Sequence, residues 1–147
     1  MSNLIPFNGK TVVLVDGECN FCRRSVAWLR PLISTEIYFY AYQTADLVTH
    51  GISIEECEKS VQLIKGNYRS SGARAIADLL TLAGGSYRAA AMTVRTLGKL
   101  SDFGYEWIAR NRGSELVIKI SQFFYCDILI LGDRSGVISK KKIKSVI

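Results

Sequence analysis

The chain has 147 residues, of which 48% are hydrophobic and 22% are charged. This length and apolar content suffice for one buried core, so we expect a single domain over residues 1–147 and exclude a disordered or low-complexity chain. The formal net charge is +6, and much of the excess comes from four lysines near the C-terminus: Lys140, Lys141, Lys142 and Lys144. We interpret them as a solvated basic tail and expect no nucleic-acid partner.

The first ten residues and residues 116–131 indicate the compartment in which the protein is expected to lie. The first ten residues, MSNLIPFNGK, have neither a positively charged start nor a long apolar stretch, so we expect a cytoplasmic protein. Residues 116–131 are strongly apolar, but polar residues interrupt a segment too short for a comfortable bilayer span. We therefore expect no transmembrane segment. An intracellular compartment keeps structural thiols reduced, so any disulfide among the four cysteines should be transient.

The first elements follow from short hydrophobic patterns. Thr11–Val15 reads TVVLV, a β-branched run that predicts a buried strand ending at Asp16 and Gly17. Apolar residues then recur on one helical stripe, at Cys22, Val26, Leu29 and Ile33. Pro31 lies within this stripe, so the helix should kink there or end and restart. Alternation over residues 37–42 predicts a second strand with tyrosines on one face.

Capping and turn residues indicate the next elements. Thr44 is expected to cap one short helix, and Ser53 with Glu56 forms a capping box for another. Residues 61–70 contain two short strand patterns around Gly66-Asn67, which predicts a β-hairpin. The order up to this point is strand, helix, strand and hairpin.

The rest of the chain is predominantly helical in pattern. One helix should begin at Ser71 and stop at Gly84-Gly85, and two more should cover residues 86–100 and 102–112, the second capped by Asp102. Both of these later helices could cover the sheet. Beyond Gly113 the pattern leaves a further helix from Ser114, or a hairpin built from residues 127–131 and 137–139, open.

The stretch VDGECNFCRR contains the residues with the clearest chemistry. Cys19 would lie at the start of the first helix, where unpaired backbone N–H groups and the helix dipole favour a thiolate, and Cys22 would lie one turn further on. Cys19 is then the candidate nucleophile and Cys22 the resolving thiol. Asp16 either hydrogen-bonds the cysteine loop, accepts a proton from Cys22, or is an ordinary turn residue with Gly17.

Two further residues could support this chemistry. Arg23 and Arg24 follow the second cysteine directly and would add positive charge beside the thiolate if either guanidinium turns toward it. Alternatively, both guanidinium groups face water.

Three other interpretations use the same segment. A structural zinc would need two more ligands, for which Cys57, Cys126 and His50 are available without a second CxxC spacing. A phosphotransferase of the haloacid dehalogenase type would need a second aspartate, where this chain has Glu18. Two buried cysteines at a strand-helix junction would need no chemistry at all. We predict no metal and no cofactor, and interpret Cys57 and Cys126 as packing thiols.

VLVDGECNFCRRSV, residues 13–26, resembles the DCC-type thiol-disulfide oxidoreductases, named for the aspartate and two cysteines of DGxCxxC. Residues 60–80 are similar to the family's hairpin and following helix, and YEWIARNR, residues 105–112, is similar to its late helix. The resemblance covers about residues 11–112 and leaves 113–147 as a C-terminal extension. It implies a thioredoxin-like α/β fold, with a βαβ unit, a β-hairpin and a helix, followed by additional C-terminal helices.

The same resemblance implies disulfide exchange by Cys19 and Cys22 on a thiol or disulfide substrate, either a protein or a small molecule. One feature departs from thioredoxins, which place a cis-proline before the third strand: the only prolines here are Pro6 and Pro31. The alternative to an oxidoreductase is a non-catalytic thioredoxin-like interaction module that docks a partner through the basic tail and the apolar C-terminal segment.

Overall fold

A four-stranded sheet forms the centre of the protein. The structure, a computed structural model, describes residues 9–120 and residue 122. The strands are β1 (Thr11–Val15), β2 (Tyr38–Ala41), β3 (Gln62–Lys65) and β4 (Tyr68–Ser71), in the spatial order β2-β1-β3-β4. β1 pairs in parallel with β2, and the β1–β3 and β3–β4 pairs are antiparallel. β1 is therefore a central strand with a partner on each side.

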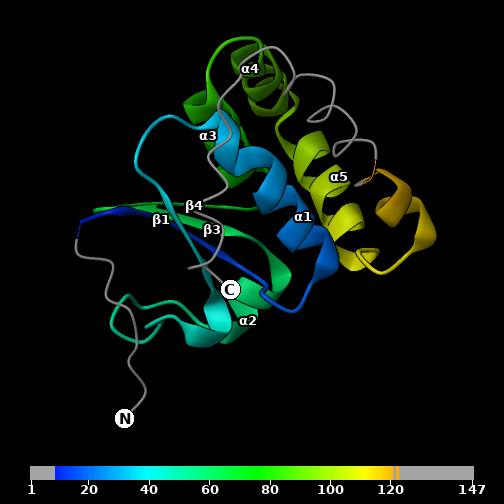
Figure 1. Ribbon diagram of the computed structural model, residues 1–147. Coiled ribbons are helices and arrows are strands. Elements are labelled where there is room, and N and C mark those ends of the chain that lie inside the picture. The colour runs from blue at the N-terminus through cyan, green and yellow to red at the C-terminus, as the bar shows by residue number, and fades with distance from the viewer. Residues whose placement is uncertain (1–8, 121, 123–147) are drawn as a thin grey trace.

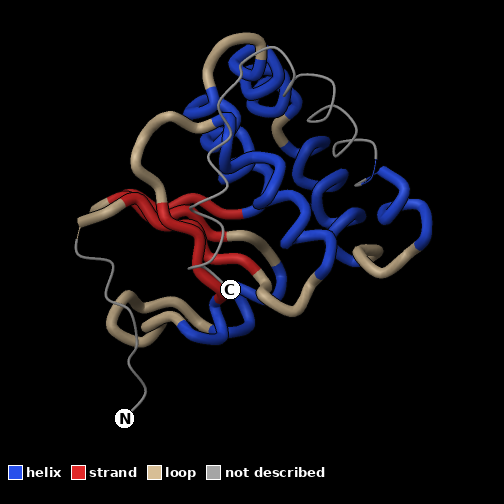
Figure 2. The backbone as a smooth tube through the Cα atoms, in the orientation of Figure 1, coloured by secondary structure: helices blue, strands red, loops and turns tan. Residues whose placement is uncertain are grey.

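Helices lie on both faces of this sheet (Figures 1 and 2). They are α1 (Asn20–Leu29), α2 (Ile54–Lys59), α3 (Gly72–Ala83), α4 (Tyr87–Leu97) and α5 (Lys99–Arg110), with short 3₁₀ helices η1 (Arg30–Leu32) and η2 (Tyr42–Thr44). Residues 115–120 are also helical. Figure 1 shows α1 and α3 on one face of the sheet and α2 on the other.

The alternation of β1 builds one hydrophobic core on each face. Val12 and Leu14 point into a cluster with Ile64 and Cys57 of α2, whereas Val13 points into a cluster that includes residues of α1 and α3. All three β1 side chains are fully buried. Because successive strand residues face opposite sides, a short unbroken apolar run fits a strand covered on both faces.

Most of the predicted elements are confirmed. β1 has the predicted bounds, the β3–β4 hairpin turns at Gly66-Asn67, and α3 ends at Gly84. The first helix ends at Leu29 and continues as a 3₁₀ turn containing Pro31. The capping box is present: the Glu56 N–H donates to Ser53 Oγ at 3.2 Å, and the Ser53 N–H donates to the Glu56 carboxylate at 2.9 Å.

Two of the capping predictions are wrong. Thr44 is the last residue of η2 rather than the cap of a following helix, and its hydroxyl donates back to the Ala41 carbonyl. Asp102 lies inside the first turn of α5, because the boundary between α4 and α5 falls at Gly98, which has a φ of 49°. Glycine adopts such a positive φ without steric cost, so it can end one helix and begin the next.

The two late helices also differ from their expected placement over the sheet. α4 packs mainly on α3, and α5 contacts both α3 and α4. The structure is thus a mixed α/β, thioredoxin-like core with additional C-terminal helices, as the sequence predicted. In the described part of the chain, no helix is long and apolar enough to cross a membrane. The hairpin considered for residues 127–139 and the four-lysine tail lie outside the described residues.

Leu79 tests the packing of α3 against the sheet. Its side chain is 2% exposed and lies in the cluster beneath α1 and α3. We expect Leu79→Ala to lower the free energy of unfolding by about 2 to 5 kcal/mol, because the truncation loses apolar burial and leaves a cavity. Urea denaturation measures this change. Leu100→Ala is the matched control: Leu100 is 65% exposed, and an equal loss there would contradict the assignment of the core.

Candidate active site

The N-terminus of α1 brings the two cysteines of the CxxC motif together. Cys19 is the N-cap residue, with extended backbone angles, and its Sγ accepts a hydrogen bond from the Cys22 N–H at 3.4 Å. The Cys19 carbonyl accepts from the Arg23 N–H, which begins the helical hydrogen-bond ladder. Both thiols are free and partly exposed. The structure therefore places Cys19 at the helix start and Cys22 one turn further on, as the sequence indicated.

Asp16 organises the loop between β1 and α1. Its Oδ1 accepts from the Glu18 N–H at 3.0 Å and from Gln43 Nε2 at 2.9 Å, and Gln43 Oε1 accepts from the Gly17 N–H at 3.2 Å. Gln43 thus spans the aspartate and the glycine of the motif. Sequence reasoning missed Gln43, although β2 pairs in parallel with β1 and so delivers η2 to the same edge of the sheet.

Gly17 is required by a close approach between the two segments. A Cβ atom built at Gly17 would lie 2.7 Å from the Cβ of Ala41, at the end of β2. Carbon atoms in proteins do not approach this closely without displacing one another, so any larger residue would push the loop away from β2. The glycine of the motif has a steric function here as well as its place in a turn.

Arg112 reaches the site from the far end of the described chain. Its Nη1 lies 3.5 Å from Cys22 Sγ and 3.9 Å from the Asp16 carboxylate. Two backbone carbonyls hold the guanidinium: Nη2 donates to Glu58 O at 2.7 Å and Nε donates to Ala109 O at 2.8 Å. The sequence signalled Arg112 only as the last residue of a segment similar to a family motif, and gave it no role.

Burial and the Arg112 guanidinium act in opposite directions on the pKa of the Cys22 thiol. The pKa of Cys22 is raised to about 12, chiefly by burial and also by its hydrogen bond and charge interaction with Cys19, while the Arg112 guanidinium lowers it. Burial also raises the pKa of Cys57 to about 11. Cys57 is 3% exposed within a hydrophobic cluster, which is the environment expected of a packing thiol.

The remaining predicted site residues are the two arginines after the motif and the candidate metal ligands. Arg23 and Arg24 are exposed on α1, and their support of the thiolate stays a prediction. His50 lies in the loop before α2. In the part of the chain that the structure describes, no group of three or more His, Cys, Asp or Glu side chains could hold a metal ion. Cys126 lies outside the described residues.

The backbone before β3 is held differently from the proline device of thioredoxins. The Val61 N–H donates to the Tyr105 hydroxyl at 2.9 Å, and the Val61 carbonyl accepts from the Gly72 N–H at 3.0 Å. Among the described residues no peptide bond is cis. Ser60, Gly72, Tyr105 and Arg112 line a cavity of about 680 Å³ along α5. The cavity thus shares Arg112 with the dithiol.

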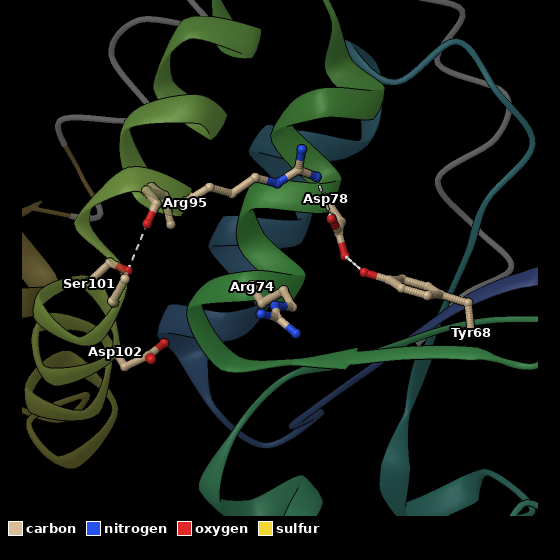
Figure 3. A pocket seen from close by; sticks show the side chains of 8 residues that line it. Tyr68, Arg74, Asp78, Arg95, Ser101 and Asp102 are labelled. Atoms are coloured by element: carbon tan, nitrogen blue, oxygen red, sulfur yellow. Dashed lines mark hydrogen bonds and ion pairs between the residues drawn. The ribbon is translucent and has the colours of Figure 1, made fainter.

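A second cavity, of about 360 Å³, lies between β4, α3, α4 and α5 (Figure 3). Its central carboxylate, Asp78, accepts from Tyr68 at 2.8 Å, from Ser70 at 2.7 Å and from Arg95 at 2.6 Å. Burial raises the pKa of Asp78, but these three donors outweigh it and the net pKa is lowered. The network joins β4, α3 and α4, and none of the cavity's lining residues is a cysteine.

Comparison with protein-family models identifies a family for most of the chain. A family model described as DCC1-like thiol-disulfide oxidoreductase matches residues 13–115. The matched segment begins in β1, contains the CxxC pair and extends past Arg112. No curated protein and no solved structure matches the chain.

Gly17→Ala tests the close approach of the cysteine loop to β2. We expect this variant to lose about 1 to 3 kcal/mol of stability, because the added methyl group overlaps Ala41. Gly104→Ala provides the control: Gly104 is exposed within α5, nothing lies within 4 Å of the added carbon, and alanine should stabilise the helix by about 0.5 to 1 kcal/mol. Thermal and urea unfolding measure both changes, and a neutral Gly17→Ala would contradict the steric argument.

Asp78→Asn should show a pH-dependent loss of stability. The pKa of Asp78 is lowered in the folded protein, so its contribution is present above the unfolded pKa of about 3.9 and is lost as the pH falls through the folded value. We expect a deficit of about 1 to 3 kcal/mol at pH 7 that shrinks as the pH falls from about 5 through the lowered pKa of Asp78. Urea titrations across this range measure it. For the exposed Asp102→Asn we expect a change within about 0.5 kcal/mol, and a pH-independent deficit at Asp78 would refute the assignment.

Proposed function

Because the chain belongs to the DCC1-like thiol-disulfide oxidoreductase family, we propose that it catalyses dithiol–disulfide exchange with Cys19 and Cys22 as its redox pair. The observation that carries this proposal is the placement of Cys19 as the N-cap of α1 with Cys22 in its first turn. A CxxC pair in this position has one thiol at the positive end of a helix and the other within one helical turn of it.

Cys19 is the nucleophile of the first step. The N-terminus of α1 presents backbone N–H groups that have no partner within the helix, and one of them, from Cys22, already donates to Cys19 Sγ. These groups stabilise negative charge on the sulfur, and the partial exposure of Cys19 leaves it accessible to a substrate. The thiolate attacks one sulfur of the substrate disulfide, forms a mixed disulfide and expels the other sulfur as a thiolate, which takes up a proton.

Cys22 completes the exchange in the second step. Its thiolate attacks Cys19 Sγ, the Cys19–substrate bond breaks, and the substrate leaves as a second thiol after protonation. The protein dithiol loses two electrons and two protons, and the substrate disulfide gains them. A dithiol reductant or substrate reverses these steps, so the same site serves either direction. The substrate class is a thiol or disulfide on a protein or small molecule.

Asp16 serves this site as an organiser of the loop. Its carboxylate holds the Glu18 N–H and Gln43, and lies 3.9 Å from Arg112. These contacts support a structural and electrostatic role for Asp16 beside the dithiol. They tie the motif to β2 on one side and to the end of α5 on the other.

A non-catalytic interaction module is the second candidate. It is favoured by large apolar side chains exposed on the late helices: Met92 is 65%, Leu100 65% and Phe103 69% exposed. The two candidates differ in the reactivity of Cys19, since a redox cysteine is accessible and present as the thiolate near neutral pH. Failure of Cys19 to react with iodoacetamide at pH 7 in the folded protein would favour the module.

Cys22→Ser should trap the mixed disulfide. Without the resolving thiol, the adduct on Cys19 cannot be released by internal attack, so it should accumulate and survive non-reducing electrophoresis. Intact-mass measurement after exposure to oxidised glutathione checks this with one small disulfide, and cell extracts check it with protein disulfides. Cys19→Ser is the control and should form no such adduct at the CxxC motif. Absence of a Cys19 adduct in Cys22→Ser, together with no disulfide reduction by the wild type, would refute the proposed function.

A further inference from the structure

We infer that Arg112 is a catalytic residue of the second step, in which its guanidinium stabilises Cys22 Sγ as the thiolate that attacks Cys19 Sγ. This inference rests on the proposed function. Its geometric basis is the 3.5 Å approach of Arg112 Nη1 to Cys22 Sγ, across 90 residues of sequence. The contact joins the turn after α5 to the first turn of α1.

The guanidinium is held in place before any substrate arrives. Its Nε and Nη2 donate to the carbonyls of Ala109 and Glu58, at 2.8 and 2.7 Å, and its side chain is only 24% exposed. These bonds fix the plane of the group and leave Nη1 toward the sulfur. A donor that is already oriented needs no reorganisation when negative charge develops on its partner.

The need for such a donor is greatest once the mixed disulfide has formed. In the free dithiol, burial and the neighbouring Cys19 both raise the pKa of Cys22, and Arg112 lowers it. Once Cys19 is bonded to the substrate it carries no charge, so its effect disappears and burial and the cation remain as the opposing influences on Cys22. Positive charge at 3.5 Å then favours the anionic sulfur that the second step requires.

Charged and titratable groups from several elements interact with Cys22. Cys19 faces it from the start of α1, and Arg112 faces it from the turn after α5. Tyr105 of α5 interacts electrostatically with both cysteines, and burial raises the pKa of its hydroxyl, so it is neutral near pH 7. Asp16 lies 3.9 Å from Arg112 and orients the cation rather than Cys22 itself.

The electron balance of this step is complete without another reactant. The Cys22 proton leaves to water, the Cys22 sulfur forms a bond to Cys19 Sγ, and the Cys19–substrate bond breaks to give the substrate thiolate. In the reverse direction Cys22 is the leaving group. Arg112 then stabilises the departing thiolate by the same contact.

A two-phase reaction with 5,5′-dithiobis(2-nitrobenzoate) tests the inference in the full chain carrying Cys126→Ser. The first thionitrobenzoate released reports attack by Cys19, and the second reports attack by Cys22 on the mixed disulfide. We expect Arg112→Gln to slow the second release by about 3- to 30-fold at pH 7, because a shift of about 1 to 3 pKa units is partly offset by higher intrinsic nucleophilicity. The first release should change less.

Two further variants distinguish this role from a structural one. Arg110→Gln is the matched control, since Arg110 lies two residues away with a side chain 80% exposed and paired with Glu106. It should react as the wild type does. Arg112→Lys keeps the positive charge but loses the hydrogen bonds to the two backbone carbonyls. Its second-phase rate should therefore lie between those of the wild type and Arg112→Gln. The second-phase rate of Arg112→Gln should also keep rising to higher pH than that of the wild type.

The outcomes separate the inference from the function beneath it. If the wild type releases both equivalents and forms the Cys19–Cys22 disulfide, but Arg112→Gln and Arg112→Lys match Arg110→Gln in the second phase, the role of Arg112 is refuted and the exchange reaction stands. If the wild type forms no Cys19–Cys22 disulfide, both fail. If circular dichroism shows that Arg112→Gln has lost its fold, the second-phase rate of Arg112→Lys tests the inference instead. A rate below that of Arg110→Gln supports the role of Arg112, and an equal rate refutes it.

Discussion

The burial of β1 between two partner strands determines where everything else in the site can lie. Val12, Val13 and Leu14 are fully buried, with parallel β2 on one side and antiparallel β3 on the other. A strand fixed on both edges and both faces cannot shift its register without moving every side chain to the wrong face. Its last residue therefore delivers the DGxCxxC loop to one defined edge of the sheet, where β2 also ends.

The two segments that complete the site depend on this edge. Gln43 follows β2 and bonds both Asp16 and Gly17, while the contact between Gly17 and Ala41 leaves no space for a side chain at the glycine. The loop is thus fixed against β2 before α1 begins. Cys19 can then take the N-cap position with a set orientation, and this gives the sulfur its helix N–H donor.

The late helices extend the thioredoxin-like core and return the chain to the dithiol. α4 and α5 pack on α3, which in turn packs on the sheet, so the end of α5 is positioned relative to α1 through α3 and the core beneath it. Tyr105 binds the backbone at Val61, and Arg112 binds the carbonyl of Glu58 and approaches Cys22. The turn after α5 therefore contributes a cation to the dithiol of α1, and the Glu58 carbonyl helps to hold it there.

Local patterns were sufficient for most of the secondary structure. The strand at residues 11–15, the capping box at Ser53 and the Gly66-Asn67 hairpin each depend on neighbouring residues, and each is confirmed. Thr44 and Asp102 were misassigned because Ser, Thr and Asp can occupy caps, turns and first turns alike. In the structure, Gly98 takes the N-cap position of α5 and leaves Asp102 in the first turn, while Thr44 ends the short η2 that follows β2.

The sequence by itself determined the dithiol, because a CxxC after a buried strand and at the start of an amphipathic helix is a local arrangement, here within residues 11–29. It also determined the thioredoxin-like order of elements. Only the tertiary structure brought Arg112 to the site: it lies 90 residues from Cys22 in the sequence, and its Nη1 is 3.5 Å from Cys22 Sγ. The physical reason is that sequence patterns report the periodicity of neighbouring residues, whereas a contact across 90 residues depends on how the helices pack. The packing of the late helices places the turn after α5, and with it Arg112, beside the Cys22 sulfur.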